Sequence, residues 1–290
     1  MTDNKHVLQG YIAAVATLVI WSGFALVSRL GGKSPLTPYD VYALRVVTAA
    51  IVLIPFAKRL PAGAWKDGRL WLLTALCSLI YCPLSYSGFK YAPAAHGGIL
   101  MAGMQPLLTS IVTLLLYRKL PGRIRAWGLL LSTTGIVCSA VPYFTDWSPL
   151  MAYGDFLIFL SSICWAIYSV LAAQWRYSPW GLTCAIAFGS FIVYMPIYWL
   201  FLPKALDVAP MSAMVTQAIF QGIFATIVAM ITYLKALSIL GTERCAPLLA
   251  TVPIVIGLVA VPLLDEPLTA WLMAGLLLVS LGAFVASKQK

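Results

Sequence analysis

The feature that most constrains this chain is a succession of apolar runs, each about as long as a helix that crosses a lipid bilayer. A crossing helix needs about 20 mainly apolar residues. Of the 290 residues, 61% are hydrophobic and only 10% are charged. The runs predict ten transmembrane helices, at residues 8–30, 39–57, 70–90, 94–117, 125–142, 153–175, 180–202, 214–240, 244–264 and 269–287. We therefore predict an all-α membrane protein without a separate water-soluble catalytic domain.

The basic residues indicate which side of the membrane holds the termini. An even number of helices puts both termini on one side, and loops rich in Lys and Arg stay in the cytoplasm. With the N-terminus inside, the outer loops hold only Arg29, Lys33, Lys90 and Lys204. The inner loops and tails hold Lys5, Lys58, Arg59, Lys66, Arg69, Arg118, Lys119, Arg123, Arg125, Arg176, Arg244, Lys288 and Lys290. Both termini are predicted to be cytoplasmic, in a cell inner membrane.

The formal net charge of +10 does not indicate a nucleic-acid partner. A nucleic-acid binder presents a basic face on a water-exposed surface, whereas the basic residues here lie in short loops between apolar runs. They are explained by the orientation rule and by attraction to anionic lipid headgroups. The predicted partners are therefore membrane lipids and a small-molecule substrate, and the sequence leaves the oligomeric state open.

The two halves of the chain resemble each other. A shift of 147 positions pairs Tyr86 with Tyr233, Pro106 with Pro253, Gly128 with Gly275 and Gly135 with Gly282, and a shift of 144 pairs Trp21 with Trp165. Because five helices is an odd number, the second half enters the membrane from the opposite side. We predict two inverted-topology five-helix repeats, residues 1–147 and 148–290. This is the topology of alternating-access carriers, with the substrate site near the midplane.

These features resemble the drug/metabolite transporter superfamily, in its EamA-type ten-helix branch. The resemblance covers nearly the whole chain and rests on the duplicated unit, the early Trp of each half, the helix-borne prolines and residues 264–269. The first half departs from the pattern, because Arg118 and Lys119 stand where an acidic pair is expected. The aromatic content is similar to that of bacterial exporters of aromatic amino acids. The resemblance implies a metabolite carrier.

Aromatic side chains near the midplane are the first candidates for substrate binding. Trp21 lies about 11 residues into its predicted helix, roughly 16 Å along the axis, and Trp165 lies at the equivalent depth in its own half. That depth excludes a role in the interfacial aromatic belt and leaves core packing or the wall of a cavity. Further aromatic faces with a hydroxyl come from Tyr81, Tyr86, Tyr168 and Tyr233. Tyr86 and Tyr233 are candidates to line or gate the two openings, with plain packing as the alternative.

Three polar residues complete the candidate site. A charged side chain within the bilayer is costly unless it faces a wet cavity or a partner. Arg45, about two turns into the second predicted helix, is expected to meet a substrate carboxylate, with snorkelling to the interface as the alternative. Gln105 is expected to contact the polar end of the substrate. His96, at the outer end of the fourth helix, is a candidate gating or pH-sensing residue, and a plain interfacial histidine is the alternative.

Several reaction classes are disfavoured by what the sequence lacks. No Asp or Glu lies in the middle of a predicted helix, whereas proton-coupled pumps usually carry intramembrane carboxylates. The six cysteines show no Cys-x-x-Cys spacing and are interpreted as buried apolar residues. There is no Walker motif, no His-Glu-x-x-His sequence and no Ser/His/Asp set at one depth. We expect no metal site, no cofactor and no enzymatic activity.

The predicted function is export of small amphipathic metabolites by alternating access, most of all aromatic amino acids, in a facilitated, uniport-like manner. Three alternatives stay open. A broad exporter of cationic drugs would use the same aromatic residues through cation–π contacts. An importer of a small metabolite would have the same fold. A membrane receptor or intramembrane enzyme would show no substrate flux.

Overall fold

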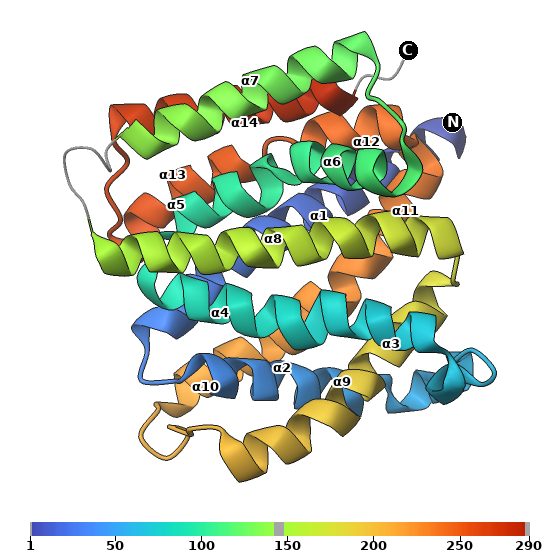
Figure 1. Ribbon diagram of the computed structural model, residues 1–290. Helices are drawn as coiled ribbons and strands as arrows, with labels where there is room; N and C mark the ends of the chain where they lie inside the picture. The colour runs from blue at the N-terminus through green and yellow to red at the C-terminus, as the bar shows by residue number, and fades with distance from the viewer. Residues whose placement is uncertain (1, 142–147, 288–290) are drawn as a thin grey trace.

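The computed structural model describes residues 2–141 and 148–287, and every regular element in these ranges is a helix (Figure 1). Up to residue 141 the helices are α1 (Thr2–Lys33), α2 (Pro38–Leu53), η1 (Ile54–Arg59), η2 (Ala64–Lys66), α3 (Gly68–Thr74), η3 (Ala75–Ile80), α4 (Tyr81–Tyr91), α5 (Ala94–Gly97), η4 (Gly98–Gly103), α6 (Gln105–Tyr117) and α7 (Arg123–Ala140). From residue 148 they are α8 (Pro149–Trp175), α9 (Pro179–Phe201), α10 (Met211–Gln217), η6 (Ala218–Val228), α11 (Ala229–Leu240), α12 (Thr242–Leu249), α13 (Val252–Leu264) and α14 (Ala270–Ser287). The predicted division at residue 147 falls outside the described residues.

Within the described ranges, nine continuous helical stretches are long and apolar enough to cross a membrane. A helix satisfies its backbone hydrogen bonds internally, which lipid requires. The nine are His6–Lys33, Pro38–Arg59, Gly68–Tyr91, Ala94–Tyr117, Pro149–Trp175, Pro179–Phe201, Met211–Leu240, Arg244–Leu264 and Ala270–Ser287. They agree with nine of the ten predicted helices to within a few residues, and the chain is a multi-pass membrane protein.

The remaining predicted crossing, 125–142, corresponds to α7. This helix is 18 residues long but is not one of the nine stretches. Two arginines and several Gly, Ser and Thr residues make α7 less apolar than the other long helices. It lies beside α14 (Figure 1). A Cβ placed on Gly128 would lie 2.6 Å from the Gly282 carbonyl oxygen, and one on Gly135 would lie 2.8 Å from the Gly275 carbonyl oxygen. Glycine is therefore required for this close approach, while the count of ten crossings stays a prediction.

Several long helices contain interruptions. The π-helical turns η3 and η6 lie within the third and the seventh of the nine stretches, and η4 lies within the fourth. New α-helices begin at Gln105 and Val252, each with a proline in its first turn, where the missing N–H costs nothing. Pro106 and Pro253 thus mark the starts of new helical segments. Wide turns of this kind often occur at functional sites.

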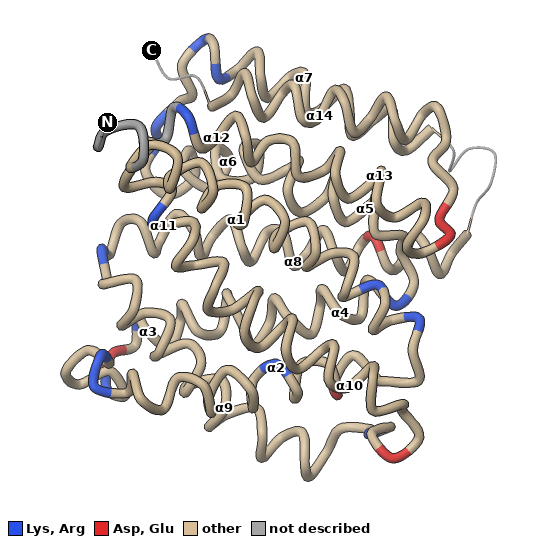
Figure 2. The backbone as a smooth tube through the Cα atoms, turned by 180° about the vertical axis from the view of Figure 1, so that it is seen from behind, with Lys and Arg blue, Asp and Glu red and all other residues tan. Residues whose placement is uncertain are grey.

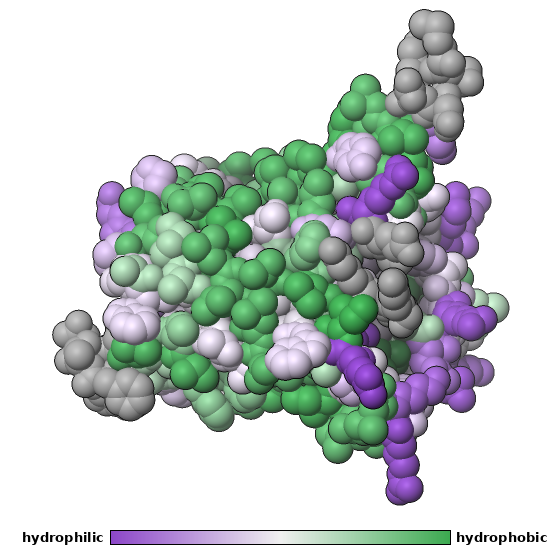
Figure 3. Space-filling model, turned by 90° about the horizontal axis from the view of Figure 1, so that it is seen from above, coloured by the Kyte–Doolittle hydropathy of each residue, from purple (hydrophilic) through white to green (hydrophobic). Residues whose placement is uncertain are grey.

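The charges divide the bundle into two ends. Figure 2 shows that Lys and Arg gather at the end that holds both termini, called the terminus end below, while most Asp and Glu lie at the opposite end. The face seen in Figure 3 is apolar across its middle and hydrophilic toward its ends. Large exposed apolar side chains such as Leu115, Leu200 and Phe201 belong to the lipid-facing surface.

Candidate functional site

A cavity of about 580 Å³ runs from the middle of the bundle to the terminus end. Its lining comes from both halves of the chain, and its size suits a small metabolite. At the terminus end the lining reaches Arg125 at the start of α7 and Ser287 at the end of α14. Six of the nine residues predicted for the site line this cavity: Trp21, Arg45, Tyr81, Gln105, Trp165 and Tyr233.

The cavity wall is built from aromatic pairs that join helices distant in sequence. The ring centroids of Trp21 on α1 and Tyr233 on α11 lie 5.3 Å apart, and those of Tyr81 on α4 and Trp165 on α8 lie 5.1 Å apart. These separations fall in the range that aromatic pairs favour. Trp21 is 37% exposed within the bundle, which leaves an aromatic face free to contact a ligand.

Phe24 is a wall residue that sequence reasoning missed. Its ring lies 6.1 Å from that of Tyr81, and it also lines the cavity. Its position three residues after Trp21 places the two on neighbouring parts of one helix face. That spacing was the available signal, but an apolar Phe in an apolar helix does not stand out from the residues that face lipid.

Arg45 brings a positive charge into the cavity. Its Nη1 donates a hydrogen bond to the Tyr86 hydroxyl at 3.2 Å, and its Cζ lies 5.9 Å from the centre of the Phe24 ring. Among the described residues, no carboxylate lies within ion-pair distance of Arg45. The guanidinium therefore has donors left for a ligand anion.

A buried hydrogen-bond chain holds Arg45 in place. The Tyr86 hydroxyl donates to Oε1 of Gln221 at 3.3 Å, and Nε2 of Gln221 donates to Ser28 Oγ at 3.1 Å. Tyr86 is only 2% exposed and does not line the cavity. It therefore positions Arg45 in this arrangement, whereas the sequence suggested that it lines or gates an opening.

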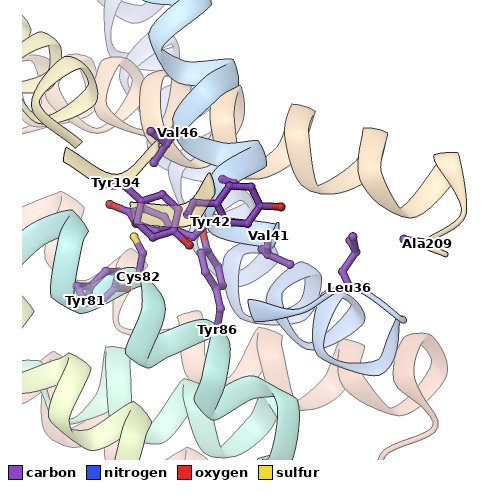
Figure 4. Close-up of a cluster of buried hydrophobic side chains, with 11 residues drawn as sticks. Leu36, Val41, Tyr42, Val46, Tyr81, Cys82, Tyr86, Tyr194 and Ala209 are labelled. Carbon is purple, nitrogen blue, oxygen red and sulfur yellow. The ribbon is translucent and has the colours of Figure 1, made fainter. Parts of the chain in front are cut away.

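A tyrosine cluster supports the helix that carries Arg45 (Figure 4). The Tyr42 and Tyr194 rings lie 4.3 Å apart, and the Tyr42 hydroxyl is 2.8 Å from Ser78 Oγ. Near the start of α2, the fully buried Asp40 accepts hydrogen bonds from the Tyr198 hydroxyl at 2.5 Å and from the Ala205 backbone N–H at 3.0 Å. Asp40 also caps α2, so this carboxylate has a structural role.

The remaining predicted residues lie beside or away from the cavity. Gln105 lines it and donates from Nε2 to the Ser162 carbonyl oxygen at 3.2 Å. Tyr168 does not line it, but its ring packs behind Trp165 at 5.2 Å. His96 is separate, with Nδ1 2.9 Å from Oδ2 of Asp155, and both residues line another pocket of about 290 Å³. The structure therefore does not bring His96 together with the aromatic residues.

A largely buried ion pair lies at the end opposite the termini, and we call this the sealed end. Nε of Arg29 lies 2.7 Å from Oε1 of Glu266, and their side chains are only 14% and 9% exposed. Arg29 also donates to the carbonyl oxygens of Phe89 and Lys90 at 2.9 and 3.0 Å, while Glu266 accepts from the Ala94 N–H at 2.8 Å. Nothing in the sequence pairs Arg29 with a residue 237 positions away.

A buried apolar layer lies between the cavity and this ion pair. Phe89 and Ala94 are fully buried and pack in one cluster with Val252 and Ile256, which also line the cavity. Lys33 adds a hydrogen bond to the Leu264 carbonyl oxygen. The sealed end is thus closed by apolar packing and by charge together.

The described residues contain no group of three side chains that could hold a metal ion. The six cysteines are unpaired, and one of them, Cys245, lines the cavity. The chemistry that this arrangement offers is recognition: aromatic surface, the guanidinium groups of Arg45 and Arg125, and a few amide and hydroxyl groups.

Comparison with known proteins places this geometry in a family. The EamA-like transporter family matches residues 8–141 and residues 152–288. An uncharacterized transporter of Archaeoglobus fulgidus is 24% identical over 98% of this chain and 100% of its own length. The uncharacterized transporter YyaM of Bacillus subtilis is 24% identical over 70% of this chain and 68% of its own length. A crystal structure with a TM-score of 0.64 and 20% identity covers 98% of this chain and 97% of the other, and shows a shared fold.

Proposed function

The chain belongs to the EamA-like transporter family, and from that premise we propose that it exports small amphipathic metabolites that carry a carboxylate, aromatic amino acids among them. The transported molecule occupies the aromatic cavity, which is reached from the two sides of the membrane in turn. The observation that carries this proposal is Arg45, a guanidinium without a carboxylate partner among the described residues, within an aromatic wall.

Two inverted repeats, residues 1–147 and 148–290 with five crossings each, would supply alternating access. The family matches residues 8–141 and again 152–288. Arg118 and Asp265, which the shift of 147 pairs, follow α6 and α13 and both have φ of 54°. The π-helical turn η3 likewise falls, after this shift, inside η6. These correspondences support the repeats and a crossing by α7.

The substrate class follows from the lining chemistry. An aromatic side chain of the substrate stacks on Trp21 or Trp165, while the carboxylate accepts hydrogen bonds from Arg45. Since an unpartnered charge at this depth is costly, a bound carboxylate stabilises the occupied cavity. No Asp or Glu is among the described lining residues, so a cationic drug lacks a counter-charge there, and a substrate that carries a carboxylate is better supported.

We propose uniport-like transport for the same reason. Asp40 is engaged in capping α2, and the His96–Asp155 pair lies outside the cavity. A proton therefore has no described acidic group to occupy in competition with the substrate. The membrane orientation proposed from the sequence, with cytoplasmic termini in a cell inner membrane, is supported by the gathering of Lys and Arg at the terminus end (Figure 2).

The test is uptake of labelled tryptophan into proteoliposomes, with and without an imposed pH gradient. We expect saturable uptake without a gradient, and a loss of about tenfold or more in Trp21→Ala, Trp165→Ala and Arg45→Gln, since each removes a direct ligand contact. Trp199→Ala is the matched control, because Trp199 is 67% exposed on α9 and does not line the cavity. Absence of uptake by folded protein contradicts the substrate class, and uptake only with a gradient contradicts uniport.

A further inference from the structure

A second guanidinium lines the same cavity, at the terminus end. Arg125 is the third residue of α7, and its side chain is half-buried. Its Nε donates a hydrogen bond to Ser110 Oγ at 3.0 Å, and Ser110 in turn donates to the Pro106 carbonyl oxygen at 2.6 Å. The guanidinium is thus anchored to α6 beside Pro106, another lining residue.

The terminal nitrogens of Arg125 make no hydrogen bond with any residue that the structure describes. No described carboxylate lies within ion-pair distance of Arg125 either. From the sequence alone, Arg125 is one of several basic residues at a helix end and is explained by membrane orientation. In the structure Arg125 differs from Arg123, two residues earlier. Arg125 is hydrogen-bonded to Ser110 and lines the cavity, whereas Arg123 is exposed and does not line it.

The cavity therefore contains two positive charges and, among its described lining residues, no negative one. A cleft with low-dielectric walls and charges of one sign concentrates ions of the opposite sign. The planar fork of a guanidinium matches the geometry of a carboxylate. The ammonium group of an amino acid, by contrast, meets no carboxylate among the described lining residues. It meets neutral acceptors, namely the side-chain amide oxygen of Gln105 and hydroxyl groups such as those of Thr109 and Ser169, and the aromatic faces.

We propose that Arg125 is a second anion-binding position of the transport pathway, which binds the substrate carboxylate at the terminus end of the cavity while Arg45 binds it near the midplane. Two such positions and no counter-charge give the cavity a preference for aromatic carboxylates of net negative charge over zwitterionic amino acids. This inference rests on the proposed function, because it assumes that this cavity is the transport pathway.

A lipid phosphate offers the same chemistry as a substrate carboxylate. Arg125 lies in the first turn of its helix, where arginines can reach headgroups. The choice of lipid distinguishes these two anions experimentally, because phosphatidylcholine has no net charge whereas phosphatidylglycerol is anionic.

The experiment measures equilibrium binding and uptake of two probes that differ only in the amine, indole-3-propionate and tryptophan. The parent protein, Arg125→Gln and Arg123→Gln are compared in phosphatidylcholine liposomes. We expect indole-3-propionate to bind more tightly than tryptophan, and Arg125→Gln to weaken its binding about fivefold to tenfold, as for loss of a charge-assisted hydrogen bond. Arg123→Gln removes the same charge from the same helical turn and is expected to leave the Kd unchanged.

The outcomes separate this inference from the proposed function. If the parent protein transports tryptophan but Arg125→Gln binds both probes as the parent does, the second anion position is wrong and the proposed function stands. If tryptophan binds more tightly than indole-3-propionate, the charge preference is wrong. A defect of Arg125→Gln seen only with phosphatidylglycerol present assigns Arg125 to lipid and overturns the inference. Weakened anion binding without transport supports the binding position and contradicts the carrier function.

If Arg125→Gln does not fold, Arg125→Lys is used, which keeps the charge and loses the planar fork. We then expect a smaller loss of indole-3-propionate affinity, of about twofold to fivefold. An unchanged Kd in folded Arg125→Lys overturns recognition by the guanidinium fork.

Discussion

The two ends of the bundle are closed to different extents. At the sealed end, the buried Arg29–Glu266 ion pair lies over an apolar layer that contains Phe89 and Ala94. At the terminus end, the cavity lining continues to Arg125 and to Ser287, the last described residue of α14. This is the arrangement expected of a carrier that faces the side of its termini. A buried apolar layer and an ion pair at one end, and a lined cavity at the other, distinguish the two ends.

The proposed repeats make this comparison sharper. The shift of 147 places Glu266 on Lys119, and the shift of 144 places Arg29 on Ala173. At the terminus end, the position equivalent to Glu266 therefore has no acidic residue, and the position equivalent to Arg29 has no basic residue. The ion pair has no equivalent there. A pair present at one end only stabilises the conformation in which that end is closed. The asymmetry of two otherwise similar halves is predicted to set the resting state.

The largest effect is expected from Arg29→Ala. It leaves Glu266 buried without its partner and removes the hydrogen bonds to Phe89 and Lys90, and breaking such a buried pair typically costs about 3–5 kcal/mol. We expect a thiol at the sealed end, introduced as Ala94→Cys, to react about tenfold faster or more with an impermeant maleimide. The double variant Arg29→Ala/Glu266→Ala removes the unpaired charge and should recover part of the protection. An unchanged labelling rate in Arg29→Ala would show that the ion pair does not close this end.

The next effect concerns the apolar layer. A Cβ on Gly97 would lie 2.3 Å from a carbon of the Phe89 ring, so Gly97→Ala overpacks the layer. Overpacking costs about 1–3 kcal/mol, and we expect a lower midpoint of thermal unfolding in detergent. Gly122→Ala is the control at the terminus end, because no heavy atom lies within 4 Å of its added Cβ. Equal midpoints for the two variants would contradict tight packing at the sealed end.

A smaller effect is expected when the missing ion pair is supplied at the terminus end. The double substitution Lys119→Glu and Ala173→Arg introduces at the terminus end the residue types of the Glu266–Arg29 pair, at the positions that correspond to them. Both positions are exposed, so the added pair contributes no more than about 1 kcal/mol. We expect initial uptake from the terminus side to slow by about twofold to fivefold, with each single substitution less effective. Faster uptake in the double variant would argue against the correspondence of the repeats.

The smallest effect concerns a loop contact at the terminus end. The Tyr177 hydroxyl donates to Oδ2 of Asp67 at 2.6 Å, and this hydrogen bond lowers the pKa of the Asp67 carboxyl. A depressed folded-state pKa contributes stability that is present above the unfolded value, near 3.9, and is lost as the pH falls through the lower folded value. In Tyr177→Phe we expect the Asp67 pKa to rise toward its ordinary value, as measured by NMR titration, and the stability at neutral pH to change little. An unshifted Asp67 pKa would contradict the assigned cause.

The sequence predicted the membrane helices well because bilayer thickness demands long apolar runs. The third predicted helix, 70–90, corresponds to Gly68–Tyr91. The exception is α7, where Gly and Ser residues serve close packing against α14 and, together with two Arg and two Thr residues, lower the apolar signal. Hydropathy reports contact with lipid, and it weakens where a helix is adapted to contact another helix.

The sequence predicted how deep the site residues lie along their helices, but not the direction in which each side chain points around its helix. Trp21 and Trp165 were placed near the midplane from their distance along the helix, and both line the cavity. Tyr86 was predicted for the site together with Tyr81. The two residues are five positions apart on one helix, so their side chains point about 140° away from each other. Tyr86 therefore lies behind Arg45 and not in the cavity wall. Arg125 and the Arg29–Glu266 pair were hidden because contacts between distant helices leave no trace in one sequence.

The central claim is that the aromatic cavity is a substrate site reached from the terminus side while the other end is closed. In a Cys245→Ser background, a thiol at the lining position Ser169→Cys tests it by maleimide labelling from each side of oriented vesicles. We predict labelling from the terminus side, slowed by saturating tryptophan or indole-3-propionate, and little labelling from the other side unless Arg29→Ala is present. Equal labelling from both sides, or labelling that neither ligand slows, would contradict the account.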